Sequence, residues 1–218
     1  MFATTKLVLP PRGALPKTNV EDPVDYYYRP LTARIYRDRL KLAVDLLGPG
    51  PFDAVLDVGY GSGIFIPELA RRAGRVVGLE IHGEAASVEE ALRRLGIDAE
   101  LRSGDLLAMP FADESFDAVV CLSVLEHLTE LDEALTELRR VVRASGTVVL
   151  GFPVQNFITD AFFRVAGYDP RRMHPSSHTD IFAAVERHTA LPIERRAHSP
   201  RFLPIALSGY AACRCRAA

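Results

Sequence analysis

The sequence predicts an α/β fold in which a seven-stranded, mostly parallel β-sheet carries helices on both faces. Three observations support this. Short apolar segments alternate with segments of helical periodicity along most of the chain. The apolar segments are nearly continuous, as expected of strands that are buried on both faces. Regular alternation of strands and helices is typical of a parallel sheet between two helical layers.

The expected elements follow in chain order. A helix over 31–47 ends where two glycines and a proline, at 48–50, interrupt helical geometry. A later helix over about 180–188 has Thr179 as its expected N-cap. The remaining helices are expected at 64–73, 84–95 and 132–142. The strands are expected at 52–59, 75–80, 99–105, 116–123, 146–152, 192–198 and 205–215, the last two joined by a turn around Ser199 and Pro200.

The length of 218 residues suits a single folded domain. Four prolines and weak periodicity predict that residues 1–23 form an extended or mobile arm. Residues 24–218 are expected to form one domain. Its cofactor-binding core is expected at about 50–155, followed by an insertion at about 154–180 that shapes the acceptor pocket.

Charge and cysteine content exclude several classes of protein. The formal net charge of −2 lacks the basic excess typical of nucleic-acid binding. We read the arginines near the C-terminal end as a solvated face. No uncharged apolar stretch reaches about 20 residues, so no transmembrane helix is expected. The three cysteines fit no zinc pattern, and we expect no metal site. Unpaired thiols and the lack of an evident signal peptide predict a cytoplasmic protein.

The stretch "VLDVGYGSGIF" (55–65) places three alternating glycines directly after an apolar strand. Ligands of open α/β sheets bind beyond the carboxyl ends of the strands, where this turn is expected. A dinucleotide fingerprint requires a small residue at its sixth position, and that position holds Ile64 or Ile66 here. A phosphate-binding P-loop would need a Gly-Lys-Ser/Thr sequence, which is missing. The turn therefore predicts close backbone approach to a ligand without a phosphate cradle.

Three carboxylates are expected at the ends of successive strands. Asp57 ends the first strand, Glu80 the second and Asp105 the third. Glu80 is placed to accept hydrogen bonds from ribose hydroxyls, and Asp105 to meet an exocyclic amine, although Asp after Gly is also ordinary turn chemistry. Carboxylates without a phosphate cradle suit a cationic nucleoside. S-adenosylmethionine (SAM) combines a sulfonium, an α-amino group, a ribose and an adenine, and is the predicted cofactor.

The segments "VLDVGYGSG", "VVGLE", "GDLLAMPFADESFDAVVCLSVLEHL" and "ALTELRRVVRASGTVVL" resemble class I SAM-dependent methyltransferases of the type 11 family. The resemblance covers roughly residues 50 to 155. It implies a Rossmann-like, doubly wound sheet with an antiparallel last strand. It also implies that SAM is converted to S-adenosylhomocysteine (SAH).

The resemblance also implies roles for individual residues. The methionine part of SAM would lie against Asp57 and the turn from Gly59 through Gly61 to Gly63, and its ribose against Glu80. Asp105 and Leu106 would flank the adenine, with Ile81 covering it, and Ser123 would border the transferred methyl group or merely cap a turn. Two positions depart from the family pattern: Tyr60, where a small residue is more usual, is expected to narrow the pocket, and Ile81-His82 replaces a small polar pair.

Candidate catalytic residues lie outside these motifs. In similar enzymes the N-terminal segment folds over the cofactor, so Tyr28 or a neighbouring tyrosine is expected either in the active site or packed on the sheet. His127 follows the fourth strand and is either a base or bonded to nearby backbone. His178, in the irregular segment after the fifth strand, is the preferred base, because histidine titrates near neutral pH. Phe157, Phe162 and Phe163 would line the acceptor pocket or form core.

The sequence thus predicts a SAM-dependent methyltransferase that acts on a small-molecule acceptor by O- or N-methylation, as a monomer or homodimer. Three other functions stay open. One is a partner subunit that binds SAM without methyl transfer. Another is a cyclase in which SAM is bound but does not react. An NAD-linked oxidoreductase is disfavoured by the missing fingerprint glycine.

Overall fold

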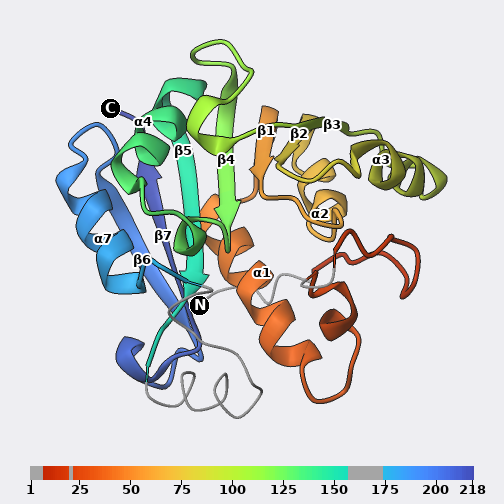
Figure 1. Ribbon diagram of the computed structural model, residues 1–218, viewed down its shortest axis with the longest axis horizontal. Helices are drawn as coiled ribbons and strands as arrows, with labels where there is room; N and C mark the ends of the chain where they lie inside the picture. The colour runs from red at the N-terminus through yellow and green to blue at the C-terminus, as the bar shows by residue number, and fades with distance from the viewer. Residues whose placement is uncertain (1–6, 20–21, 157–173) are drawn as a thin grey trace.

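The computed structural model describes residues 7–19, 22–156 and 174–218, and its centre is a seven-stranded sheet in the order β3-β2-β1-β4-β5-β7-β6 (Figure 1). The chain order reverses between β1 and β4, and ligands of doubly wound folds bind at such a switch point. The strands are β1 (Phe52–Val58), β2 (Ala73–Glu80), β3 (Glu100–Ser103), β4 (Phe116–Leu122), β5 (Val142–Pro153), β6 (Ile193–Ser199) and β7 (Tyr210–Arg216).

The pairing of the strands confirms the mostly parallel sheet with an antiparallel last strand. β1 pairs in parallel with both β2 and β4, and β4 pairs in parallel with β5. β7 is antiparallel to β5 on one side and to β6 on the other. The carboxyl ends of the parallel strands therefore meet at one edge of the sheet.

Helices cover both faces of the sheet, as predicted. One core joins the sheet to α4 (Leu131–Val141) and α7 (His178–Arg187). The opposite core joins it to α1 (Ala33–Leu47), α2 (Ile66–Ala70) and α3 (Ala85–Arg94). Neighbouring residues of the central strands enter different cores, as Val119 and Val120 do, which explains why these strands are apolar throughout.

Two helix boundaries differ from the prediction. Helix α2 is shorter than the expected 64–73, because Phe52 N–H donates to the Arg72 carbonyl at 2.8 Å and Ala73 already pairs in β2. Thr179 is not the N-cap of α7. Ser177 caps this helix, since its hydroxyl accepts from Asp180 N–H while the Asp180 carboxylate accepts from Ser177 N–H. This reciprocal arrangement is a capping box.

The described part of the N-terminal arm, residues 7–19, has no helix or strand and packs on the α1–α3 side of the sheet. Leu15 is buried in that core. Val8 N–H donates to the Glu68 carboxylate at 2.6 Å, and the Tyr28 hydroxyl donates to the Pro10 carbonyl at 2.6 Å. Within the described residues, no helix is both long enough and apolar enough to cross a bilayer.

Candidate functional site

The glycine turn after β1 depends on backbone that only glycine adopts easily. Gly59, Gly61 and Gly63 have φ values of 78°, 53° and 80°. A Cβ atom on Gly59 would lie 2.1 Å from Val124 Cγ2, and one on Gly63 would lie 2.9 Å from Val88 Cγ1. A Cβ atom on Gly61 would meet open space. The turn therefore packs tightly at both ends and is open at Gly61, where a ligand can approach the backbone.

Asp57 lies at the end of β1 with 3% of its surface exposed. Its Oδ2 atom is buried and has no hydrogen-bond partner among the described residues. Burial, together with the nearby negative charge of Glu80, raises the pKa of Asp57 to about 7. A buried carboxylate oxygen without a partner is costly, and a cationic or donor-rich ligand at this edge would satisfy it.

Glu80 ends β2 and is already fixed in place by backbone groups. Its Oε2 accepts from Gly61 N–H at 3.0 Å, and its Oε1 accepts from Ile81 N–H at 2.8 Å. A carboxylate has about four acceptor sites, so each oxygen keeps capacity for a further donor. His82 Nε2 also contacts the Gly61 carbonyl at 2.9 Å. The turn after β1 and the end of β2 thus form one hydrogen-bonded unit.

Tyr60 and Ile81 have opposite environments. The Tyr60 ring is 3% exposed and packs against Gly78 of β2 and the edge of the His82 ring, so it fills core volume; whether it also narrows the pocket stays a prediction. The Tyr60 hydroxyl is buried without a hydrogen-bond partner in the described structure, and burial raises its pKa. Ile81 is 77% exposed beside Glu80, as a residue that covers a flat ring would be.

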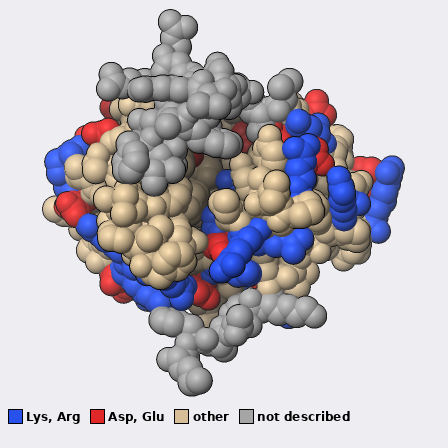
Figure 2. Space-filling view, turned by 90° about the horizontal axis from the view of Figure 1, so that it is seen from below, with Lys and Arg blue, Asp and Glu red and all other residues tan. Residues whose placement is uncertain are grey.

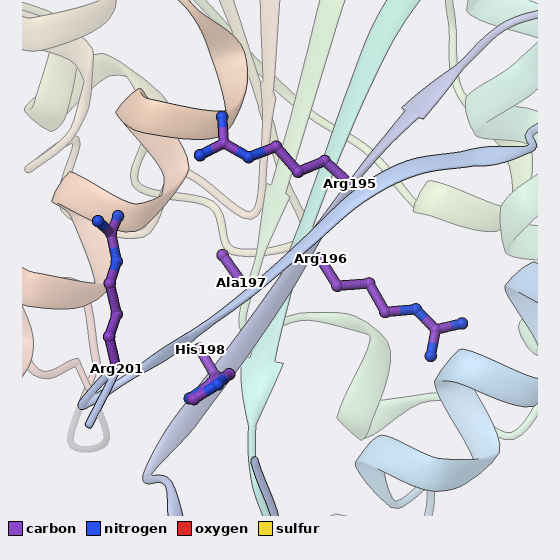
Figure 3. A pocket seen from close by; sticks show the side chains of 5 residues that line it. All are labelled: Arg195, Arg196, Ala197, His198 and Arg201. Atoms are coloured by element: carbon purple, nitrogen blue, oxygen red, sulfur yellow. The ribbon is translucent and has the colours of Figure 1, made fainter. Parts of the chain in front are cut away.

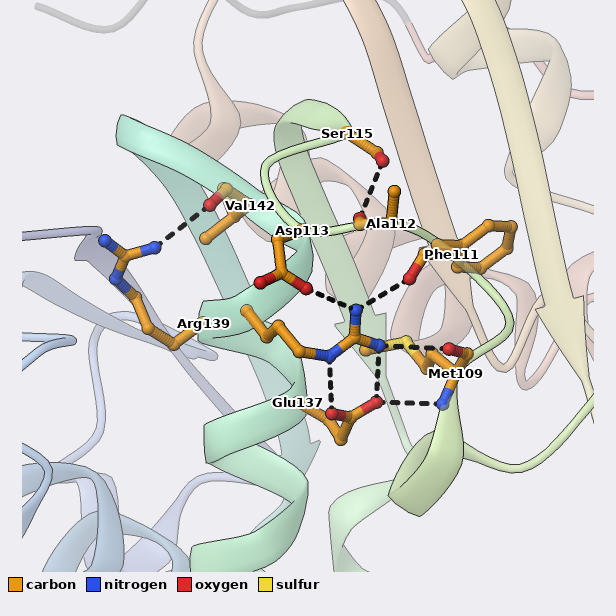
Figure 4. A network of polar contacts seen from close by, with 9 residues as sticks. Met109, Phe111, Ala112, Asp113, Ser115, Glu137, Arg139 and Val142 are labelled. Atoms are coloured by element: carbon orange, nitrogen blue, oxygen red, sulfur yellow. Dashed lines mark hydrogen bonds and ion pairs between the residues drawn. The ribbon is translucent and has the colours of Figure 1, made fainter.

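The region after β3 is held by an ion-pair network. Asp105 Oδ1 accepts from Leu107 N–H at 2.9 Å, so Asp105 caps a short 3₁₀ helix, η2 (Leu106–Ala108), while Leu106 is buried. The Arg140 guanidinium of α4 pairs with Glu137 and Asp113 and donates to the carbonyls of the loop (Figure 4). These groups raise the pKa of Arg140. Asp105 thus caps η2 through Leu107 N–H, and Arg140 holds the loop after η2 to α4.

Ser123 follows β4 with a φ of 59°, a left-handed conformation that is uncommon for residues other than glycine. Its Oγ lies 3.1 Å from the Tyr210 hydroxyl, which comes from the distant strand β7. Tyr210 is buried, and this burial raises its pKa. Tyr210 is not recognisable as a site residue from sequence, because only the antiparallel pairing of β5 with β7 brings it to Ser123.

Two of the three neighbouring tyrosines, Tyr27 and Tyr28, have different hydrogen-bond partners, and the proposed role of Tyr28 in the active site stays a prediction. The Tyr28 hydroxyl is engaged by Pro10, whereas Tyr27 is 1% exposed and its hydroxyl accepts from Arg39 Nε at 2.9 Å. The Arg39 guanidinium lies 4.7 Å from the centre of the Tyr36 ring and 5.1 Å from that of Tyr27. Arg39, which the sequence analysis missed, forms no ion pair within the described part of the chain.

The histidine candidates occupy two places. His178 is the first residue of α7, and burial lowers its pKa, although Asp180 opposes this. His127 lies in the 3₁₀ helix η3 (Leu125–His127), with its ring 5.0 Å from that of His174. Burial and then the charge of His127 lower the pKa of His174 to about 4. Phe157, Phe162 and Phe163 lie outside the described residues.

Arg195 and Arg196 of β6 line a basic hollow of about 260 Å³ together with Ala197, His198 and Arg201, which follows the strand (Figure 3). Arg195 and Arg201 point toward α1, where both contact Asp45, whereas Arg196 points the other way and pairs with Glu186 of α7. In the view from below, Lys and Arg side chains gather beside a central hollow, on the right and at the lower left (Figure 2). These three arginines thus tie β6 and the turn after it to α1 and α7.

Comparison with known proteins places this geometry in a class. Residues 56–150 match the family model described as a methyltransferase domain. An uncharacterized 37.1 kDa protein in transposon TN4556 of Streptomyces fradiae is 32% identical over 154 residues, which cover 67% of this chain and 44% of that protein. A demethylmenaquinone methyltransferase of Roseiflexus castenholzii is 35% identical over 106 residues, covering 48% of this chain and 44% of that protein.

The solved structure of a geranyl diphosphate methyltransferase in complex with SAM has a TM-score of 0.68 at 19% identity, covering 86% of this chain and 87% of that one. The sheet order and the glycine turn thus define the class I methyltransferase fold. The family match over residues 56–150 and the shared fold confirm the resemblance of this part of the chain to class I SAM-dependent methyltransferases of the type 11 family. The chain spans less than half the length of the first curated relatives that it matches.

Proposed function

We propose that this protein transfers a methyl group from SAM to a small-molecule acceptor, with O- or N-methylation favoured. The observation that carries this proposal is the buried Asp57 Oδ2, which has no partner among the described residues and lies next to the open glycine turn. A phosphate would be repelled at this position, whereas an ammonium or sulfonium group would be attracted. The residues present therefore fit SAM.

Each part of SAM has a proposed partner in this arrangement. The ammonium group would be held by Asp57 and the backbone of the glycine turn, and the ribose hydroxyls by Glu80, whose carboxylate is oriented by Gly61 N–H and Ile81 N–H. The exposed Ile81 side chain supports its assignment as a cover for the adenine. The remaining proposed contacts are Asp105 and Leu106 at the adenine and Ser123 at the methyl group.

Methyl transfer from SAM requires no covalent bond between the protein and the reactants. Bound SAM supplies an electrophilic methyl group on a good leaving group. Alignment of the two reactants can then contribute about 7–11 kcal/mol in well-oriented cases. A hydroxyl acceptor must also lose a proton, and we assign this step to His178. Burial lowers the pKa of His178, so its imidazole is neutral at pH 7 and can accept a proton.

The acceptor is proposed to be a small molecule because neither charge nor composition favours a polymer. The net charge of −2 does not suit nucleic acid, and the arginines of the basic hollow, Arg195, Arg196 and Arg201, have partners within the fold. The demethylmenaquinone methyltransferase among the relatives carries the name of a small-molecule acceptor. We propose that the protein acts in the cytoplasm as a monomer or homodimer.

A single incubation separates this function from its rivals. The protein is mixed with SAM and a metabolite extract, and mass spectrometry follows SAH and products that are heavier by one methyl group. A methyltransferase forms both in equal amounts. A cyclase or a partner subunit binds SAM but releases no SAH, and this outcome would overturn the proposal.

His178→Ala tests the proposed base. We expect turnover to fall roughly 100-fold, the lower end for loss of a general base, with the affinity for SAH unchanged. Steady-state rates and calorimetry measure the two quantities separately. Unchanged turnover would show that the base lies elsewhere or is not required.

A further inference from the structure

The turn after β4 presents two potential metal ligands in succession. Ser123, with its φ of 59°, directs the chain away from the sheet and into η3. This 3₁₀ helix carries Glu126 and His127 as neighbours. Glu126 is 2% exposed, whereas His127 is exposed to solvent. The pair therefore joins a buried carboxylate to an imidazole that solvent can reach.

Backbone hydrogen bonds bring a third ligand to this pair from a distant segment. Ser176 N–H donates to the Glu126 carbonyl at 3.3 Å, and the Ser176 hydroxyl donates to the Leu128 carbonyl at 2.5 Å. Gln155 Nε2 donates to the His174 carbonyl at 3.3 Å from the end of β5. These contacts fix His174 next to η3, with its ring centre 5.0 Å from that of His127.

One potential ligand atom from each of Glu126, His127 and His174 lies within 4.8 Å of the other two. Donors around a tetrahedral ion with bonds of about 2.0 Å are separated by roughly 3.3 Å, which small side-chain rotations reach from this arrangement. We infer that these three residues form a binding site for a divalent transition-metal ion. The site is distinct from the proposed cofactor contacts at β1 and β2.

The state of Glu126 is an independent indication of a cation. Its Oε2 atom is buried and has no hydrogen-bond partner among the described residues. Arg39 acts on this carboxylate only through space, because the guanidinium hydrogen bonds to the Tyr27 hydroxyl instead. A buried carboxylate is normally paired or bound to a metal. An ion between Glu126 and the two imidazoles would supply the missing partner.

The kind of donor atoms indicates the kind of metal. Two imidazole nitrogens and one carboxylate oxygen suit Zn²⁺, Fe²⁺ and similar first-row ions, whereas Mg²⁺ and Ca²⁺ prefer oxygen ligands. Three protein ligands leave at least one coordination position open, as in catalytic zinc sites. The Cys-based patterns used in sequence searches do not detect this set, because His174 is far from Glu126 and His127 in the chain.

The position of the site suggests what it does, and this role rests on the proposed function. Ser123, assigned to the methyl group, lies three residues before Glu126. An acceptor with a hydroxyl group would bind the ion at its open position, and the ion would lower the pKa of that hydroxyl. The acceptor class would then be a hydroxylated metabolite that is methylated on oxygen.

Metal binding is tested without any methyl transfer. Protein treated with a chelator is titrated with Zn²⁺ by calorimetry and with Co²⁺ by visible absorption, which reports nitrogen ligation. We expect one ion per chain. Glu126→Gln, His127→Asn and His174→Asn should each weaken binding by about tenfold or more. His188→Asn, which changes a histidine outside the cluster, should bind the metal as the unmodified protein does.

His127 is exposed, so His127→Asn should fold, as circular dichroism will verify, even if Glu126→Gln does not. Three results would overturn the site: no binding at millimolar metal, equal losses in His127→Asn and His188→Asn, or unchanged affinity in His127→Asn and His174→Asn. If the metal binds as expected but SAH is never formed, the metal site stands and the proposed methyl transfer fails.

Discussion

The ends of β1 and β2 and the end of β4 lie on the same edge of the sheet but are built in different ways. At β1 and β2, Glu80 accepts from Gly61 N–H and Ile81 N–H, so a short stretch of chain provides its own partners. At β4, Ser123 depends on Tyr210, and Glu126 and His127 meet His174 from far along the chain. The proposed cofactor side is thus encoded locally, whereas the proposed acceptor side requires the whole fold.

Asp57→Asn tests the cofactor side and should have the largest effect. Losing the charge should weaken SAH binding by about 2–5 kcal/mol, the cost typical of removing one partner of a buried charge pair. The same change should raise the thermal stability of the ligand-free protein at pH 8, because a buried ionised carboxylate is removed. Calorimetry and thermal unfolding measure these opposite effects.

Asp53→Asn is the matched control on the same strand. Its side chain is 92% exposed and forms only a 3.7 Å ion pair with Arg143, so neither affinity nor stability should change measurably. If Asp57→Asn lowers both stability and affinity, Asp57 has a structural role instead.

Glu80→Ala should weaken SAH binding by about 1–3 kcal/mol, as expected when hydrogen bonds to a charged group are lost. The turn would also lose its acceptor at Gly61 N–H. Glu100→Ala is a suitable control, because Glu100 lies on β3 and pairs with Arg75 at 2.6 Å. Equal calorimetric affinities for the two variants would contradict the ribose assignment.

The raised pKa of Asp57 makes binding depend on pH. Below about pH 7 this carboxyl is protonated in the free protein, so a cationic ligand must displace the proton as it binds. The affinity for SAH should therefore fall by up to about tenfold per pH unit between pH 7 and pH 6. The Asn variant should lack this dependence, although Glu80, Tyr60 and His82 surround the site in both proteins. If the affinity for SAH depends on pH equally in the two proteins, the pH dependence does not come from Asp57.

The same pKa shift predicts a stability change with a defined sign. The folded-state pKa of Asp57 is raised above its unfolded value near 3.9, so its contribution to stability is complete below pH 4. That contribution is lost as the pH rises through about 7. Thermal unfolding of the unmodified protein and of Asp57→Asn should therefore diverge between pH 4 and pH 7. If the difference in thermal stability between the two proteins is constant over this range, the pKa of Asp57 is not raised.

Tyr210→Phe tests the acceptor side and should have the smallest effect. The substitution removes a hydrogen bond to Ser123 worth about 1 kcal/mol, so turnover should fall about fivefold. The affinity for SAH should stay unchanged, because β4 and β5 separate β7 from β1 and its glycine turn in the sheet. A loss of affinity without a loss of turnover would place Tyr210 on the cofactor side.

The same contrast explains what the sequence could and could not predict. Strand and helix order follows from apolar periodicity, and Asp57, the glycines and Glu80 follow from their places at strand ends. The capping box at Ser177 and Asp180 is also a local pattern, but Thr179 belongs to a residue type with a similar preference for the N-cap position, and the prediction of Thr179 is wrong. Arg39, Tyr210 and the Glu126–His174 proximity were not predictable, because each depends on pairing between segments that are distant in sequence.

The central claim is that Asp57, Glu80 and the glycine turn hold the ammonium group and the ribose that SAM and SAH share. Calorimetric titration of the unmodified protein with SAH, NADH and ATP tests it most directly. We predict saturable binding of SAH and no measurable binding of the other two. Binding of NADH or ATP together with no response to SAH would contradict the account.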